Sequence, residues 1–157
     1  MASKISQLPV FRAALITALA GRANLLAPPG GLPPVQISSG SLAPEDVAAE
    51  SIMLLGAQAD EDWAVIGPTG RRREETAEQK ATIFTTRPGG GEAVIVAAAA
   101  RVFAIADEIA DTLDTDTTVT GTVRNCRISR WELREGVASE VGRWAELKLT
   151  IAYGART

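Results

Sequence analysis

The chain contains no histidine and only one cysteine, Cys126, among its 157 residues. Without histidine it lacks the commonest general base, the commonest metal ligand and the usual near-neutral pH sensor of proteins. A single cysteine cannot form an intramolecular disulfide, and it suits a reducing cytoplasm. Ser38, Ser39 and Cys126 have no histidine to activate them as nucleophiles. We predict no catalytic, cofactor-binding or metal-binding residues, and we expect that the protein is not an enzyme.

The sequence is also poor in long apolar runs and in clustered positive charge. Its formal net charge is −3, which gives no general attraction to nucleic acid, because phosphate binding needs clustered Lys and Arg. The apolar run Val94–Ala106 contains Arg101 and is shorter than the ~20 residues of a membrane helix. We expect no membrane partner and no specific binding of DNA.

The composition and length of the sequence are those of one globular domain. Hydrophobic residues make up 46% and charged residues 22% of the chain, a composition typical of folded proteins. The length fits one core, and no repeat or linker divides the chain. We predict a single domain over residues 1–157.

Two segments have the periodicity of amphipathic helices. In the first, Leu8, Phe11, Leu15 and Leu19 recur at spacings of three and four, and Gly21 is placed to end the helix. The second runs from Gly91 to Leu113. Its apolar side carries Val102, Phe103, Ala106, Ile109, Ala110 and Leu113, and its expected solvent side carries Glu108, Asp111 and Thr112.

Several segments before the second helix favour extended structure. Val35–Ser38 and Ile52–Leu55 are short predicted strands, and the acidic segment Ala57–Asp62 is expected to be exposed. Arg71–Thr86 has strong helix formers in its first half, but no apolar stripe that a helix could bury. We therefore predict a long polar strand there, after a turn at Gly67-Pro68-Thr69-Gly70.

The end of the chain predicts a β-hairpin, Thr122–Glu135 followed by Gly142–Tyr153. In the second strand Ala145, Leu147, Leu149, Ile151 and Tyr153 alternate with polar residues. In the first strand the apolar residues change parity midway, between Cys126 and Ile128 on one side and Trp131 and Leu133 on the other, which indicates a bulge or a change of packing partner. The fold class is thus α+β, a mainly antiparallel sheet packed against two helices.

Some short patterns resemble functional sites but lack their defining residues. Asp114-x-Asp116-x-Thr118 could begin a calcium loop, yet Val119 and Asn125 occupy its glycine and glutamate positions, so we interpret it as a polar turn. The glycine-rich turn Arg87–Gly91 has no phosphate-binding signature.

Five residues are candidate interface residues. Arg71, Arg72 and Arg73 form the basic cluster of the chain and could meet an acidic partner. Trp131 and Trp144 fall on facing strands of the predicted hairpin, where they could staple the sheet as a cross-strand pair or anchor a partner.

In the order of its predicted elements and in its short sequence patterns, the chain resembles the tail terminator, or tail completion, proteins of bacteriophages with long non-contractile tails. After the N-terminal helix, the resemblance is carried by Val35-Gln36-Ile37-Ser38, Leu54-Leu55-Gly56, Pro88-Gly89-Gly90, the helix ending near Leu113, Asp114-Thr115-Asp116, Gly121-Thr122-Val123 and Ala155-Arg156. It is strongest from Pro88 onward. The sequence departs from the family at the proline-rich loop Ala27–Pro34 and at Asp60–Asp62.

This resemblance implies a structural virion protein that forms a homohexameric ring. The ring would cap the tail tube, stop polymerisation of the major tail protein and join the tail to the head-tail connector proteins. Such a protein is located in the host cytoplasm during assembly and then in the virion, at the head-proximal end of the tail. Genomic DNA would pass through the lumen without specific binding.

A closed ring repeats one heterologous contact, so each subunit needs two complementary surfaces. The polar strand and the terminal hairpin are the expected ones. A head completion or connector protein of the neck is the alternative function, and a small cytoplasmic enzyme with carboxylate chemistry is an alternative of a different class.

Overall fold

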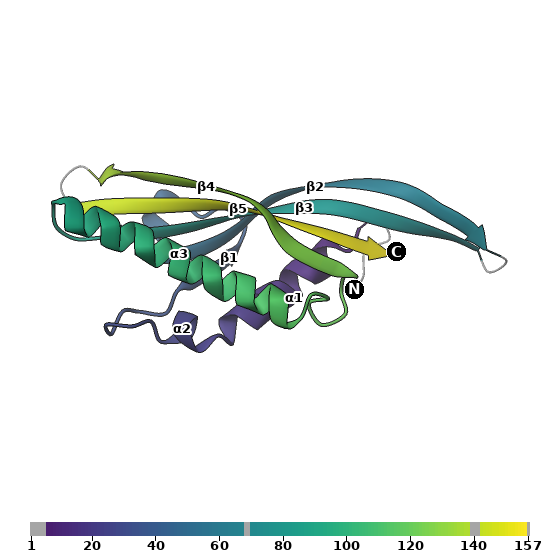
Figure 1. The fold of residues 1–157 in the computed structure, drawn as a ribbon, viewed down its shortest axis with the longest axis horizontal. Coiled ribbons are helices and arrows are strands. Elements are labelled where there is room, and N and C mark those ends of the chain that lie inside the picture. The colour runs from purple at the N-terminus through teal and green to yellow at the C-terminus, as the bar shows by residue number, and fades with distance from the viewer. Residues whose placement is uncertain (1–5, 68–69, 139–141, 157) are drawn as a thin grey trace.

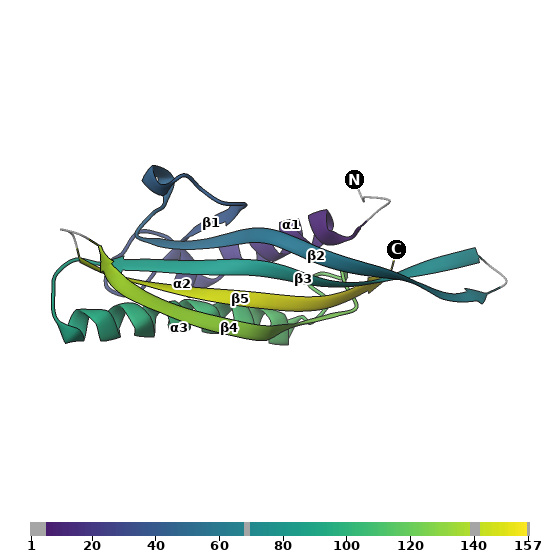
Figure 2. The ribbon, with the colours of Figure 1, turned by 90° about the horizontal axis from the view of Figure 1, so that it is seen from above.

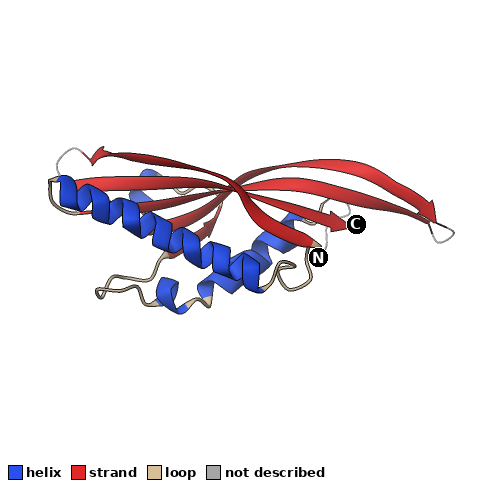
Figure 3. Ribbon diagram, in the orientation of Figure 1, coloured by secondary structure: helices blue, strands red, loops and turns tan. Residues whose placement is uncertain are grey.

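The computed structural model describes residues 6–67, 70–138 and 142–156. For residues 63–67, 70–72 and 138 it describes the backbone only. A sheet of five strands in the order β1-β2-β3-β5-β4 forms one layer of the molecule. The helices α1 and α3 lie against one face of this sheet, and among the described residues no long helix lies on the other face (Figures 1 and 3). This arrangement confirms the predicted α+β class with a mainly antiparallel sheet.

The first helical region begins where the sequence predicts it. Helix α1 (Leu8–Ala20) buries Phe11, Leu15 and Leu19 along the predicted stripe, and Gly21 caps its end. A one-turn helix, α2 (Ala23–Leu26), follows directly, and a 3-10 turn, η1 (Pro44–Asp46), lies between the first two strands. Neither of these short elements was expected, because segments of three or four residues carry no periodicity.

Helix α3 (Glu92–Thr115) is the longest helix and lies along the sheet. Of its predicted apolar side, Val102, Ala106, Ile109 and Leu113 are buried, whereas Phe103 and Ala110 are half-buried at its flank. The predicted orientation of Glu108 is wrong. Its side chain does not face solvent; the residue is only 8% exposed, because it points toward the start of α2.

Strands β1 (Gln36–Ser39), β2 (Glu50–Gly67) and β3 (Gly70–Arg87) form one half of the sheet. Strand β1 pairs in parallel with the beginning of β2, and β2 and β3 form a long antiparallel hairpin. The prediction of a strand over Arg71–Thr86 is confirmed. The short strand expected at Ile52–Leu55 and the exposed acidic segment Ala57–Asp62 belong to one continuous strand, because β3 pairs with β2 on both sides of the bulge between Leu54 and Ala57. Residues 68 and 69 of the predicted turn lie outside the described residues.

Strands β4 (Asn125–Ala138) and β5 (Gly142–Arg156) form the predicted terminal hairpin. Of the two explanations for the change of parity in β4, the structure shows the bulge, as a register shift between Ile128 and Arg130. In β5 the alternating residues Ala145, Leu147, Leu149, Ile151 and Tyr153 are all buried. They face α1 and α3 and form the floor of the hydrophobic core.

The predicted staple between Trp131 and Trp144 is wrong. Trp131 lies opposite Leu149, on the helix-covered face, whereas Trp144 lies opposite Gly136 and alternates with the buried residues of β5. The two indoles therefore belong to opposite faces of the sheet. Within the described part of the chain, no helix combines the length and the apolar character needed to cross a membrane.

Candidate functional site

The most distinctive surface of the molecule is an arm formed by the far end of the β2–β3 hairpin. Strand β5 pairs with β3 only as far as Glu74, which lies opposite Arg156. Beyond that pair, residues 63–67 and 70–73 continue as a two-stranded ribbon that projects past the rest of the sheet (Figures 1 and 2). An isolated two-stranded ribbon is marginally stable in water, so an arm of this kind is suited to contact a partner.

The root of the arm is fixed by the buried carboxylate of Glu75. It accepts hydrogen bonds from Ser6 Oγ at 2.8 Å, from the Gln7 backbone N–H at 2.9 Å and from Tyr153 Oη at 2.8 Å. Burial and the bond to Glu75 raise the pKa of Tyr153 above its usual value. Three segments that are distant in sequence thus meet at the point where the arm leaves the body.

A second polar group supports β2 at a bulge within the body of the sheet. The pairing of β2 with β3 shifts between Leu54 and Ala57. The carbonyl oxygen of Leu55, freed by this bulge, accepts bonds from Arg12 at 2.5 Å and from the Gln79 amide at 2.7 Å. Arg12 also donates to Gln79 at 3.0 Å, so α1 binds the hairpin through side chains as well as through its apolar stripe.

The opposite end of the hairpin is held by a buried ionic cluster around Glu50. Arg101 of α3 donates two bonds from Nε, at 3.0 and 3.1 Å to the two carboxylate oxygens, and one from Nη2 at 2.9 Å. Arg87, at the end of β3, makes a further ion pair. Burial alone would raise the pKa of Glu50, but the hydrogen bonds from Arg101 and Arg87 outweigh it and lower that pKa.

Glu108 forms a comparable contact between α3 and α2. It accepts hydrogen bonds from Asn24 Nδ2 at 2.5 Å and Arg22 Nε at 2.6 Å. The bond from Asn24, together with Arg22 and against the effect of burial, lowers the pKa of Glu108. In both groups each charged side chain has a partner of opposite charge within the fold, which is typical of structural rather than catalytic carboxylates.

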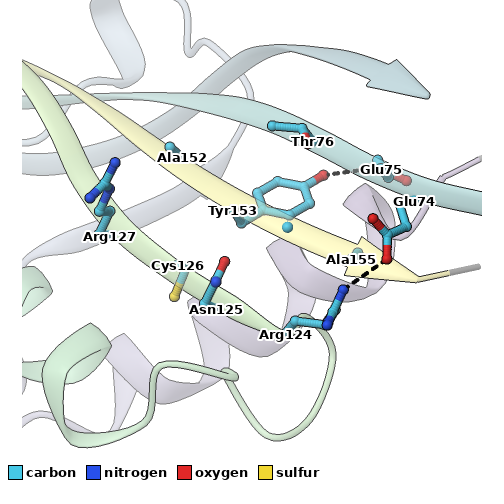
Figure 4. A pocket seen from close by; sticks show the side chains of 11 residues that line it. Glu74, Glu75, Thr76, Arg124, Asn125, Cys126, Arg127, Ala152, Tyr153 and Ala155 are labelled. Atoms are coloured by element: carbon cyan, nitrogen blue, oxygen red, sulfur yellow. Dashed lines mark hydrogen bonds and ion pairs between the residues drawn. The ribbon is translucent and has the colours of Figure 1, made fainter. Parts of the chain in front are cut away.

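A hollow of about 740 Å³ lies beside the arm, between the start of β4 and the end of β5 (Figure 4). In its wall Glu74 binds Arg124, and it also binds Arg156, each at 3.0 Å. Burial, reinforced by the nearby Asp116, raises the pKa of Cys126 in this wall to about 11. A thiol with that pKa stays protonated near neutrality, so it is a poor nucleophile and metal ligand.

The acidic turn after α3 has the structural role that the sequence indicates. Asp116 accepts hydrogen bonds from the backbone N–H of Thr118 at 2.9 Å, from its hydroxyl at 2.6 Å and from the backbone N–H of Thr120 at 2.6 Å. Its oxygens therefore close a polar turn. Among the described residues, no group of three or more Cys, Asp or Glu side chains is arranged to hold a metal ion.

The five predicted interface residues lie in three different places. Arg73 lies on the arm and binds Glu61 across the hairpin at 3.3 Å, and the side chains of Arg71 and Arg72 lie outside the described residues. Trp144 stacks on Phe84 on the helix-free face, with 6.3 Å between ring centroids. Trp131 lies on β4, where its ring makes an edge contact with Phe103 at 5.5 Å.

The expectation that the polar strand Arg71–Thr86 would offer an open edge is wrong from Glu74 onward, because β3 pairs there with both β2 and β5, whereas the terminal hairpin does provide an open edge, on β4. Strand β4 has no neighbour beyond it in the described sheet, and β2 has none after Leu54. Both edges are lined by exposed side chains, at 58–62 in β2 and at most positions of β4. Val96 on α3 and Val137 on β4 are also exposed, and neither is among the predicted interface residues. Val137 and Leu133 have the same parity in β4, and this pattern could have placed Val137 on the same face of the strand as Leu133.

Comparison with known proteins supports the fold. No protein-family model matches the sequence, and no curated protein matches it. Among solved structures, a chain from the virion of a native gene transfer agent (GTA) particle shares the fold, with a TM-score of 0.53. The alignment covers 93% of this chain and 94% of that chain at 14% sequence identity.

Proposed function

We propose that the protein is a structural component of a phage-like virion, and that its specific role is that of a tail terminator. The observation that carries this proposal is the projecting arm on a sheet with two open edges, in a fold shared with a chain of the GTA virion. The sequence resemblance to tail terminators supports the same role. The protein would act through surface contacts, without bond chemistry.

The proposed mechanism is the closure of a homohexameric ring on the end of the tail tube. Each subunit offers one open edge on β2 and another on β4, so a single contact can be repeated around an axis. The finished ring would cover the last layer of the major tail protein and block further addition. Its other side would receive the head-tail connector proteins.

Genomic DNA would pass through such a ring without specific contacts. A net charge of −3 per subunit supports this, because six copies would not attract phosphates in general. The protein would then reside in the host cytoplasm during assembly and in the virion at the head-proximal end of the tail.

The experiment is deletion of the gene in a particle-producing strain, followed by electron microscopy of the particles. A tail terminator predicts tails that grow beyond their normal length and remain unattached to heads. Tails of normal length that fail to join heads would instead indicate the head completion or connector role. Normal particles would contradict both roles. A point variant that folds normally but can no longer make the contact through its arm should give the same particles as the deletion.

A further inference from the structure

The two open edges of the sheet differ in charge. The exposed edge segment of β2, residues 58–62, contains Asp60, Glu61 and Asp62 and no basic residue. Strand β4 contains three arginines, Arg127, Arg130 and Arg134, against two glutamates. One edge is therefore acidic and the other carries a net positive charge, as two surfaces that meet each other would.

Large hydrophobic side chains are exposed on β4 and on the neighbouring helix α3. Four large hydrophobic side chains are exposed among the described residues, and three of them, Val96 at 60%, Trp131 at 59% and Val137 at 64%, belong to β4 and α3. Val96 and Phe103 are seven residues apart and so share a side of α3, and Phe103 touches Trp131. Leu133 lies between Trp131 and Val137 on the same face of β4.

We define the apolar strip as Val96, Phe103, Trp131, Leu133 and Val137. A strip of this kind beside an unpaired strand edge provides two of the usual components of a protein contact, an apolar centre and backbone groups that can pair. The charged residues along β4 make the edge selective, because a strand of like charge would be repelled. The acidic β2 edge of another copy meets this requirement.

We propose that the β4 edge of one subunit binds the β2 edge of a second copy, residues 58–62, as its next strand. This inference rests on the proposed ring and specifies its subunit contact. The contact is heterologous, since the two edges belong to different strands, so each subunit uses both edges and the chain of contacts can close. Trp131 becomes covered when the neighbour's strand is in place.

Cysteine cross-linking of the full chain tests this contact. In a Cys126→Ser background, Ala59→Cys is combined in turn with Ser129→Cys and with Glu135→Cys, and a short bis-maleimide is added at high protein concentration. All three positions are exposed and lie on the two edges. We expect at least one double variant to give a ladder of multimers. Each single-cysteine variant should give no dimer, whereas mixing the two single variants should give one.

A matched substitution tests the apolar strip. Adding Trp131→Asp to the productive double variant should lower the yield of cross-linked product at least tenfold, while circular dichroism confirms that the fold is retained. An unchanged yield overturns the role of the strip. Dimers formed by either single-cysteine variant, or no product from both double variants, overturn the edge contact. Location of the protein in particles is measured separately, so loss of the tail-terminator role and loss of this contact are distinguishable.

Discussion

The indole of Trp144 lies over Gly136 on the neighbouring strand, so closely that a Cβ added to Gly136 would come within 2.5 Å of Trp144 Cζ2. The two residues are direct partners in the pairing of β4 with β5. On its other side Trp144 stacks on Phe84 of β3. A glycine within a strand normally weakens it, but here its missing side chain makes room for an aromatic ring that links three strands.

Replacing Gly136 by alanine should therefore displace Trp144 and disturb its contact with Phe84. We expect a loss of about 1–3 kcal/mol in the free energy of unfolding, as for other overpacked sites. Urea unfolding measures this loss, and near-ultraviolet circular dichroism reports the changed environment of the indole. Gly56→Ala is the matched control, because a Cβ there meets no atom within 4 Å. Equal stability of the two variants would contradict the close packing.

The buried cluster around Glu50 gives a second prediction. Glu50→Gln leaves Arg87 and Arg101, both largely buried, without their counter-charge, and breaking a buried pair in this way costs about 3–5 kcal/mol. Thermal unfolding should show a clearly lower Tm. Glu132→Gln, which removes an exposed pair with Arg134, should leave the Tm unchanged. A similar Tm for both variants would show that Glu50 does not hold the hairpin to α3.

Acid should destabilise the protein through Glu50 and Glu108. Folding lowers the pKa of both, so their stabilising effect is complete above the ordinary glutamate pKa of about 4.3 and is lost as the pH falls through the lower folded values. The urea midpoint should therefore fall between pH 6 and pH 3. The double variant Glu50→Gln/Glu108→Gln should lose less stability over this interval, and an identical loss would assign the effect to other groups.

The thiol of Cys126 should react slowly in the folded protein. Its pKa of about 11 leaves little thiolate near neutrality, and its Sγ donates to the Thr117 carbonyl oxygen at 3.2 Å. Labelling with a disulfide reagent at pH 7.5 should be slow in buffer and at least tenfold faster in denaturing urea. Rapid labelling of the folded chain would mean that the turn before β4 opens readily.

The features that the sequence predicted well are those set by local periodicity. The stripe of α1, the alternation in β5 and the change of parity in β4 each follow from spacing within one element, and the structure confirms all three. The strand character of β3 was predictable because a helix there would have had no face to bury.

The errors concern contacts between distant segments. Glu108 is polar and lies beside the apolar stripe of its helix. Its partners Arg22 and Asn24 are more than 80 residues away in the sequence, so no pattern within the helix indicates them. The full length of β2 likewise depends on its pairing with β3. The wrong prediction of a staple between Trp131 and Trp144 could have been avoided from parity. Trp131 has the parity of Leu133, whereas Trp144 alternates with the buried residues of β5, so the two indoles lie on opposite faces.

The attachment of the arm has a mechanical consequence. A ribbon that is anchored at one end and unsupported beyond it behaves as a cantilever, in which a load at the tip produces its largest bending moment at the anchor. Here the anchor is Glu75, where the start of α1 and Tyr153 converge. A force applied to the tip is thus transmitted to the first helix and the last strand together, at opposite ends of the polypeptide.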